Sequence, residues 1–361
     1  MKVTIIAGAR PNFIKIAPMI HAIQDARNQS QNISYRLVHT GQHYDEKMSA
    51  TFFKELNIPH PDANLECGGG SQAEQTAAIL VAFEKELLAN PADLVLVVGD
   101  VTSTMACAIV AKKLNTKVAH VEAGIRSFDL SMPEEINRMV TDSITDYFFT
   151  TSTFANENLA KAGVASKDIF FVGNVMIDTL MANRSSFKRP ALFDTLNLTN
   201  RNYLVMTLHR PANVDQGEKL RHLIDQIIQN VQGLPIIFPI HPRTGKIFTD
   251  LGIEAPNLHI VDPLGYMEFN YLVENAKAVI TDSGGITEET TVMGVPCLTL
   301  RDNTERPETI ETGTNMLVGT DPNNIKPALD ILFTGDWKTG GIPELWDGQA
   351  SKRIVAELLA L

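Results

Sequence analysis

The chain has 361 residues, of which 44% are hydrophobic and 20% are charged. This length exceeds what one hydrophobic core usually supports, so we expect two globular domains. The formal net charge of −11 argues against nucleic acid as a partner, and the three scattered cysteines, Cys67, Cys107 and Cys297, indicate neither a metal site nor a disulfide framework.

Short apolar runs rich in β-branched residues alternate along the chain with longer amphipathic stretches. Strands are predicted in the first half at 2–7, 35–39, 94–99, 117–121, 146–151 and 169–173, and in the second half at 203–208, 235–240, 258–261, 278–281, 296–300 and 315–318. Helices are predicted at 71–89, 153–162, 215–232 and 266–276, with a last helix near 349–361. No run is long enough for a membrane span or a signal peptide, so we expect a cytoplasmic protein without a membrane partner.

Some of the predicted strands, such as Leu94 to Val98, are apolar throughout, without alternation. Such runs are typical of parallel strands covered by helices on both faces. The sequence therefore predicts an α/β fold with two Rossmann-like doubly wound domains facing across a cleft. We expect the domains at 1–180 and 181–344, with the C-terminal helix 345–361 joining the first.

Residues 278–306 contain a buried strand, the turn Asp282-Ser283-Gly284-Gly285, a helix and another strand. Adjacent glycines let backbone N–H groups approach a ligand, and a helix N-terminus favours an anion. Glu288 and Glu289 in that helix could accept hydrogen bonds from sugar hydroxyls, which together indicates a nucleotide. The alternative is a tight turn followed by two solvated glutamates that complement the helix dipole.

Polar residues follow several of the other predicted strands. Asp100 and Glu122 come after fully apolar strands, where an uncompensated carboxylate is costly, and we interpret them as functional. His209 and His241 each end a strand and are candidates, although a strand-end histidine is often only a turn residue. In contrast, Ser131-Met132-Pro133-Glu134 predicts a helix-capping box, in which Glu134 or Glu135 could pair with Arg138.

Several common motifs do not occur in the sequence. No G-x-G-x-x-G follows a strand, so no NAD cofactor is implied, and there is no P-loop, H-E-x-x-H or G-x-S-x-G motif. A nucleotide-sugar enzyme that needs no cofactor remains.

The motifs together resemble those of a known family. They run in the same order from Met1 to the last helix, and they are GARPNFIKIAP from Gly8, GQH from Gly41, VGDVTS from Val98, HVEAGIRS from His120, PEEINR from Pro133, TLHR from Thr207, DSGGITEE from Asp282 and RDNTERPE from Arg301. They resemble the non-hydrolysing UDP-N-acetylglucosamine 2-epimerases.

That resemblance implies a GT-B type homodimer that interconverts UDP-N-acetylglucosamine and UDP-N-acetylmannosamine in the cytoplasm. It also implies a catalytic set, namely Asp100, Glu122, Glu134 and His209. The implied substrate-binding set comprises Arg10, Lys15, Arg138, His241, Leu264, Phe269, Ser283, Gly284, Gly285, Glu289 and Arg306. Within it, Glu289 would hold the ribose, and Leu264 with Phe269 the uracil region.

Epimerisation at C2 of a sugar places its own chemical requirements on an enzyme. The C2 carbon of a pyranose has no adjacent carbonyl, so its proton is not acidic enough to be removed directly near neutral pH. Without NAD, the consistent route expels UDP from C1 to give a glycal, then adds UDP back with a proton delivered from the opposite face. Which of the three acids is the base does not follow from the sequence.

Two segments depart from the family pattern. Arg-Pro-Ala-Asn-Val-Asp follows His209 where many members have Arg-Arg-Glu-Asn, and Tyr44-Asp45-Glu46 follows Gln42-His43. We therefore do not expect activation by a second UDP-sugar, and a modified sugar such as a diacetamido uronic acid is an alternative substrate. The sequence also leaves open a hydrolysing epimerase, a GT-B glycosyltransferase and a non-catalytic sugar-nucleotide sensor.

Overall fold

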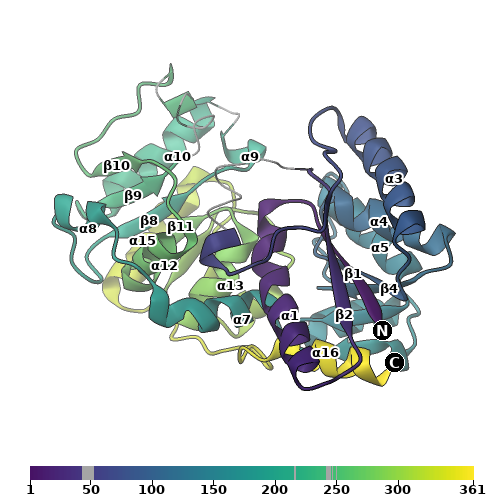
Figure 1. Ribbon diagram of the computed structural model, residues 1–361. Helices are drawn as coiled ribbons and strands as arrows, with labels where there is room; N and C mark the ends of the chain where they lie inside the picture. The colour runs from purple at the N-terminus through teal and green to yellow at the C-terminus, as the bar shows by residue number, and fades with distance from the viewer. Residues whose placement is uncertain (43–52, 215–216, 241–244, 246, 249) are drawn as a thin grey trace. The chain divides into compact units, whose positions relative to one another are not determined.

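The computed structural model describes residues 1–42, 53–214, 217–240, 245, 247–248 and 250–361 (Figure 1). These residues divide into two compact units. Unit 1 comprises Met1–Ala182 and Glu344–Leu361, and unit 2 comprises Asn183–Pro343.

Unit 1 is built on a seven-stranded sheet in the order β3-β2-β1-β4-β5-β6-β7, and its strand pairs are parallel. The strands are β1 (Lys2–Ala7), β2 (Ser34–His39), β3 (Ala63–Asn64), β4 (Leu94–Val98), β5 (Lys117–Val121), β6 (Tyr147–Thr150) and β7 (Ile169–Phe171). The central strand β4 is buried along its whole length, as its apolar sequence requires.

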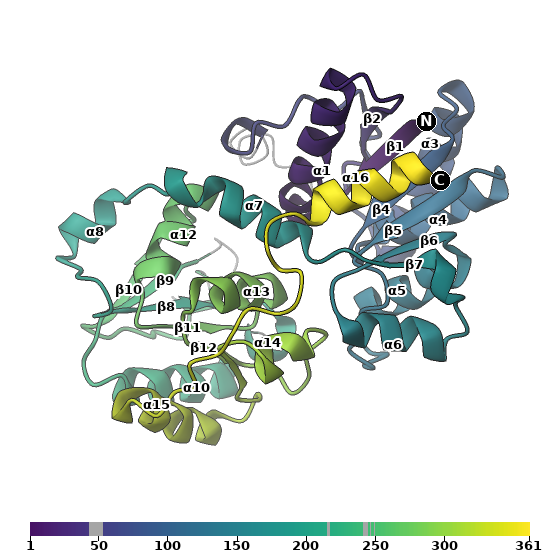
Figure 2. The same cartoon turned by 90° about the horizontal axis from the view of Figure 1, so that it is seen from below.

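The strand order of unit 1 reverses direction at β1, so right-handed crossovers place helices on both faces of the sheet. The helices are α1 (Arg10–Asn28), α3 (Gln72–Ala89), α4 (Thr102–Lys113), α5 (Pro133–Ile144), α6 (Thr153–Lys161), α7 (Val175–Asn183) and α16 (Ala350–Ala360), with a 3-10 turn at Ser166–Asp168. Helix α16 lies beside α1, far from it in sequence (Figure 2).

The return of the C-terminal helix to unit 1 has a clear physical basis. The Asp178 carboxylate, in α7, accepts hydrogen bonds from the backbone N–H groups of Ala350 and Ser351 at 3.0 and 2.6 Å. These are first-turn groups of α16 that have no acceptor within the helix. In addition, the buried indole of Trp346 donates to the Thr151 carbonyl at 2.9 Å.

Unit 2 has a six-stranded parallel sheet in the order β10-β9-β8-β11-β12-β13. Its strands are β8 (Leu204–Thr207), β9 (Ile236–Pro239), β10 (Leu258–Val261), β11 (Ala278–Thr281), β12 (Cys297–Thr299) and β13 (Asn315–Leu317). Its helices are α8 (Ala191–Thr195), α9 (Pro211–Val214), α10 (Gly217–Asn230), α12 (Tyr266–Asn275), α13 (Gly284–Met293), α14 (Pro307–Glu311) and α15 (Ile325–Thr334), with 3-10 turns at Arg184–Ser186 and Pro322–Asn324.

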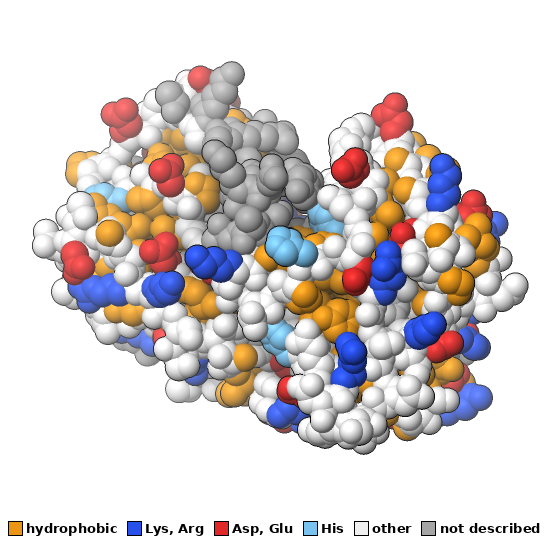
Figure 3. Space-filling model, viewed as in Figure 1, with side chains coloured by type: hydrophobic (Ala, Val, Ile, Leu, Met, Phe, Trp, Pro, Cys, Tyr) orange, Lys and Arg blue, Asp and Glu red, His pale blue; other side chains and the backbone are white. Residues whose placement is uncertain are grey.

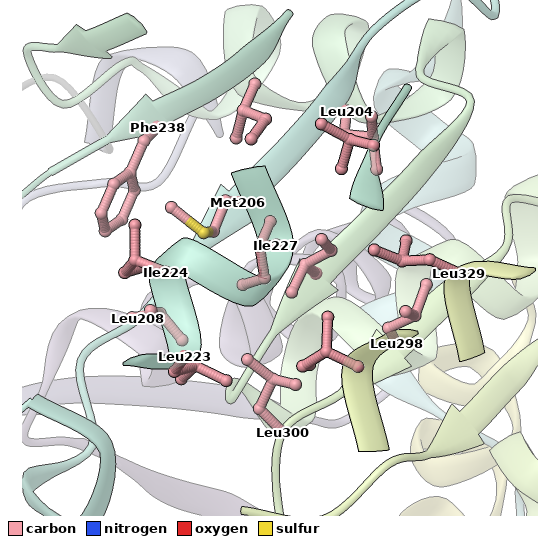
Figure 4. Close-up of a cluster of buried hydrophobic side chains, with 14 of the residues drawn as sticks. Leu204, Met206, Leu208, Leu223, Ile224, Ile227, Phe238, Leu298, Leu300 and Leu329 are labelled. Atoms are coloured by element: carbon pink, nitrogen blue, oxygen red, sulfur yellow. The ribbon is translucent and has the colours of Figure 1, made fainter. Parts of the chain in front are cut away.

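The hydrophobic core of unit 2 joins its sheet to α10 and α15. Leu204 and Met206 of β8 lie beside Ile224 and Ile227 of α10, and Leu329 of α15 completes this buried cluster (Figure 4). All five side chains are fully buried. The core thus fixes the strand whose carboxyl end leads into His209.

The predicted α/β fold class with two doubly wound parallel sheets is confirmed. The observed strands match the predicted runs to within two residues at each end, except that prediction missed the two-residue strand β3. The predicted capping box is wrong: α5 begins at Pro133 with Met132 as its N-cap residue and no side-chain cap, and the Ser131 hydroxyl donates to Asp129 instead.

In the part of the chain that the structure describes, no helix is long and apolar enough to cross a membrane. Within the same residues, no cluster of three or more histidine, cysteine or acidic side chains could hold a metal ion. Acidic and basic side chains are interspersed over the face that Figure 3 shows.

Candidate active site

In unit 1, Asp100 and Glu122 follow two strands that pair with each other. The register of β4 and β5 aligns Val98 with Val121, so both carboxylates emerge from neighbouring strand ends. Neighbouring strands lie about 4.8 Å apart. The fold therefore brings the two predicted acids together at the carboxyl edge of the sheet, where open α/β sheets bind their ligands.

Asp100 is held by α5. The guanidinium of Arg138 donates to Asp100 Oδ2 through Nε at 3.0 Å and Nη2 at 2.5 Å, and the Asn137 amide donates to the Asp100 carbonyl at 2.9 Å. The Asp100 side chain keeps 30% of its surface exposed, whereas Arg138 keeps 3%. Arg138, predicted to bind substrate, thus orients a carboxylate in this structure.

Glu122 is held by α1. Lys15 Nζ donates to Glu122 Oε2 at 2.7 Å, and both side chains are buried. Glu122 also has a φ of 69°, in the left-handed region that costs a non-glycine residue on the order of 1 kcal/mol. Such strain is concentrated at functional sites, which supports a role for Glu122. Lys15, predicted as a phosphate contact, lies against this acid.

Gly99, between β4 and Asp100, is required by the close approach of Lys15. Its φ is 68°, and a Cβ at this position would lie 3.2 Å from Lys15 Nζ. A side chain would therefore press on the cation that pairs with Glu122. The glycine therefore allows the turn that carries Asp100 to lie close to the Lys15–Glu122 pair.

The two glutamates at the start of α5 have different environments. Glu134 is exposed, so it is available to a ligand. Glu135 is buried, accepts from the backbone N–H groups of Ser127 and Phe128 at 2.9 and 3.1 Å, and pairs with Arg138 at 2.7 Å. The sequence offered Glu134 or Glu135 as the partner of Arg138, and it is Glu135 that pairs with this cation and so helps to orient it toward Asp100.

In unit 2, the predicted anion-binding turn, Asp282-Ser283-Gly284-Gly285, leads into the start of a helix. Helix α13 begins at Gly284 with Ser283 as its N-cap residue, and no side chain caps it. The first N–H groups of a helix have no acceptor within it, so those of Gly284 and Gly285 form a site suited to a phosphate. Ser283, Gly284 and Gly285 are all partly exposed.

The two glutamates of α13 are buried, which excludes the alternative that they are solvated. Glu288 pairs with the buried guanidinium of Arg306, a residue predicted to contact UDP. Glu289 accepts from the Tyr266 hydroxyl at 2.8 Å. Burial, together with the neighbouring Glu288, raises the pKa of Glu289 to about 7, against the hydrogen bonds from Tyr266 and Asn270.

His209 is oriented by the residue that follows β11. Asp282 Oδ1 lies 2.8 Å from His209 Nδ1, and Asp282 also accepts from the backbone N–H groups of His209 and Arg210 and from the Asn213 amide. Although burial raises the pKa of Asp282, these partners lower it overall. The His209 side chain is 59% exposed, so its ring is fixed on one side and open on the other.

The remaining predicted residues divide into two groups. Leu264 lies just before α12 and Phe269 within it, both half-buried in unit 2. Arg10 begins α1, but its side chain lies outside the described residues, as do His241 and Tyr44-Asp45-Glu46.

Sequence reasoning missed three further residues, Tyr266, Asp142 and His120. Only His120 had a usable signal, because it lies in β5, two residues before Glu122, which follows that strand. The partners Tyr266 and Asp142 lie 23 and 22 positions from the residues they contact, Glu289 and His120.

The fold and these groups define an α/β enzyme with two Rossmann-like units of the GT-B type, one carrying paired acids and the other an anion-binding helix start. Residues 25–359 match the sequence model of the family described as UDP-N-acetylglucosamine 2-epimerase. The chain therefore belongs to the UDP-N-acetylglucosamine 2-epimerase family, whose members are isomerases.

Individual relatives agree with this membership. The chain is 41% identical to the UDP-N-acetylglucosamine 2-epimerase of Methanocaldococcus jannaschii over 98% of both chains. It is 37% identical to the UDP-2,3-diacetamido-2,3-dideoxy-D-glucuronate 2-epimerase of Pseudomonas aeruginosa over 100% of this chain and 99% of that protein. The crystal structure of the M. jannaschii enzyme with UDP-GlcNAc and UDP matches with a TM-score of 0.90 over 100% of both chains. The Neisseria meningitidis enzyme bound to UDP-GlcNAc, at 29% identity, matches equally well over 100% of both chains.

Proposed function

We propose that this protein interconverts UDP-N-acetylglucosamine and UDP-N-acetylmannosamine. The observation that carries the proposal is the pair of strand-end carboxylates, Asp100 and Glu122, each held by one buried cation. A site that only bound UDP would not need two oriented acids. The M. jannaschii relative, similar over its whole length, was crystallised with UDP-GlcNAc and UDP, which supports the same substrate here.

We propose elimination and re-addition of UDP as the mechanism. A carboxylate of unit 1 takes the C2 proton, the C1–O bond breaks with its electron pair leaving on UDP, and a glycal remains. UDP then adds back to C1 while C2 receives a proton from the opposite face. Asp100, Glu122 and Glu134 are the candidate acid and base groups, and His209, fixed by Asp282, is the fourth member of the catalytic set.

The leaving UDP requires positive groups near its phosphates. We propose that the start of α13, at Ser283, Gly284 and Gly285, binds the diphosphate, because helix N-termini stabilise anions. Glu289 would then accept from the ribose, and Leu264 with Phe269 would border the uracil. Arg10, Lys15, Arg138, His241 and Arg306 remain the proposed cationic contacts of the substrate.

The two units are proposed as the functional domains, unit 1 supplying the acids and unit 2 the nucleotide site. We further propose a homodimer, which light scattering would show as twice the chain mass of 39.7 kDa. The three cysteines are all free, consistent with the reducing cytoplasm that we propose as its location.

Proton NMR of the protein with UDP-N-acetylglucosamine in heavy water tests the proposal. We expect UDP-N-acetylmannosamine to form and deuterium to enter C2 of both sugars. Epimerisation without deuterium would contradict the elimination route. Release of free N-acetylmannosamine and UDP would identify a hydrolysing enzyme, and transfer of the sugar to a second molecule a glycosyltransferase. Binding without turnover would identify a sensor.

A second candidate substrate is a UDP-diacetamido uronic acid. The P. aeruginosa relative that is named for such a sugar is similar over the full chain, at 37% identity against 41% for the M. jannaschii enzyme. The identities are close enough to require a direct comparison of the two substrates. A kcat/KM at least about tenfold higher for the uronic acid, equivalent to 1.4 kcal/mol, would assign it as the substrate.

A further inference from the structure

His120 is a buried histidine that lies beside both candidate acids but contacts neither through their side chains. It is in β5, two residues before Glu122, and has no exposed surface. Its Nδ1 lies 2.7 Å from Asp142 Oδ1 and its Nε2 lies 2.8 Å from the carbonyl oxygen of Gly99. Both ring nitrogens therefore face oxygen atoms.

The partners of His120 constrain the protonation of its ring. A carbonyl oxygen can only accept, so Nε2 must donate to Gly99. Asp142 Oδ2 faces two donors, Arg126 at 2.6 Å and the backbone N–H of Gly124 at 3.1 Å. Asp142 Oδ2 is thus an acceptor for Arg126 and Gly124, and the other oxygen of the same carboxyl group faces His120 Nδ1.

We propose that His120 is a positioning residue that connects the turns carrying Asp100 and Glu122. One ring nitrogen fixes the Gly99 carbonyl, directly before Asp100. The other fixes Asp142, which holds the amide of Gly124, two residues after Glu122. The inference rests on the proposed function, because it assigns a purpose to orienting these two acids.

The backbone of the two turns explains why such a connection is needed. Gly99 and Glu122 both have positive φ angles, 68° and 69°, so both turns leave regular strand geometry, with the Gly99 N–H still donating to the Val121 carbonyl at 3.0 Å. Arg138 and Lys15 orient the two carboxylate groups but not the backbone that carries them. Since a displacement of about 1 Å can lower a rate roughly 100-fold, a buried bridge between the turns has catalytic value.

The positioning role is tested with His120→Gln and Asp142→Asn. The matched control is Asp146→Asn, which removes another paired carboxylate of unit 1, bonded to Lys112, Lys117 and the Val118 amide beside the amino ends of β5 and β6. In both test variants kcat should fall about 10- to 100-fold while KM changes less than about 3-fold. The control should retain its kcat.

A measurement that does not depend on activity separates the positioning role of His120 from the proposed function. The backbone amide signals of Asp100 and Glu122 should shift in Asp142→Asn and stay in place in Asp146→Asn. Folded test variants with an unchanged kcat, or with unmoved amide signals, would overturn the positioning role. If the unmodified enzyme exchanges no deuterium at C2, the proposed function fails, while the amide signals still decide the role of His120.

Discussion

Of the two strand-end carboxylates, Asp100 can be neutralised with less damage to the fold than Glu122. Asp100→Asn removes a partly exposed charge, and Arg138 keeps its second partner, Glu135. We expect kcat to fall by a factor on the order of 10² to 10⁴, with a change of less than about 1 kcal/mol in the free energy of unfolding. C2 deuterium exchange and urea unfolding measure the two effects.

The control for Asp100→Asn is Asp25→Asn, an exposed carboxylate on α1 of the same unit. It should leave both quantities unchanged. Full activity of Asp100→Asn would remove Asp100 from the catalytic set. Glu122→Gln is a poorer first test, because it takes the negative charge from a buried pair with Lys15 and so combines catalytic and stability effects.

Glu289 should make the stability of the protein depend on pH. Burial raises its pKa to about 7 in the folded state, from about 4.5 in the unfolded chain. Between these values the unfolded chain releases the proton and the folded protein retains it, so stability falls as pH rises from about 4.5 to 7 and then levels. The full effect is on the order of 3 kcal/mol.

Glu289→Gln keeps an acceptor for the Tyr266 hydroxyl but cannot ionise. Its unfolding free energy relative to the unmodified protein should therefore increase between pH 5 and pH 8, as measured in urea. Glu157→Gln, at an exposed position of α6, is the control and should show a constant difference. A constant difference for Glu289→Gln as well would mean that Glu289 ionises normally in the folded protein.

At the scale of elements, the C-terminal helix depends on one carboxylate. Asp178→Ala removes the acceptor of the first-turn N–H groups of Ala350 and Ser351, which should cost about 1 to 2 kcal/mol. The loss should be local, so hydrogen exchange should accelerate in α16 more than in the sheet of unit 1. Lys352→Ala, an exposed change in the same helix, should leave exchange unchanged. Equal acceleration throughout unit 1 would contradict this anchoring role.

Binding of the diphosphate at the start of α13 should be weaker when residue 284 carries a side chain. A Cβ there would lie 3.1 Å from Glu305 Oε1 and 3.7 Å from Arg301, and would stand beside the N–H groups of the first turn. We expect Gly284→Ala to weaken UDP binding roughly tenfold in calorimetry. Alanine favours a helix by about 1 kcal/mol over glycine, so the protein should not lose much stability.

Gly217→Ala is a close control for Gly284→Ala. Gly217 is likewise the first residue of a helix of unit 2, α10, and its Cβ would also meet a neighbour at 3.1 Å, the Leu251 side chain. It should leave UDP affinity unchanged. If Gly284→Ala binds UDP normally, or if both variants lose affinity equally, α13 is not the specific diphosphate seat.

For the whole molecule, the two sheets could be predicted because most of their strands are short, mainly apolar runs, and runs such as Leu94 to Val98 are apolar without alternation. Strand β3 could not, because two residues carry no periodic signal. The positions of Asp100 and Glu122 also followed from the strand ends. Their cations did not, because Arg138 lies 38 positions from Asp100 and Lys15 lies 107 positions from Glu122, distances that only the fold bridges.

The division of roles between the units leads to a prediction for the whole molecule. The contacts described for Asp100 lie in unit 1 and those for Gly284 in unit 2, and changes that share no partner usually add in free energy. Asp100→Asn alone should therefore keep UDP affinity within about twofold. Asp100→Asn combined with Gly284→Ala should bind UDP as Gly284→Ala does, because only the unit 2 change touches the diphosphate seat. Calorimetry with UDP on the three variants measures this. A double variant whose affinity departs from that of Gly284→Ala by about tenfold would show that Asp100 takes part in holding UDP.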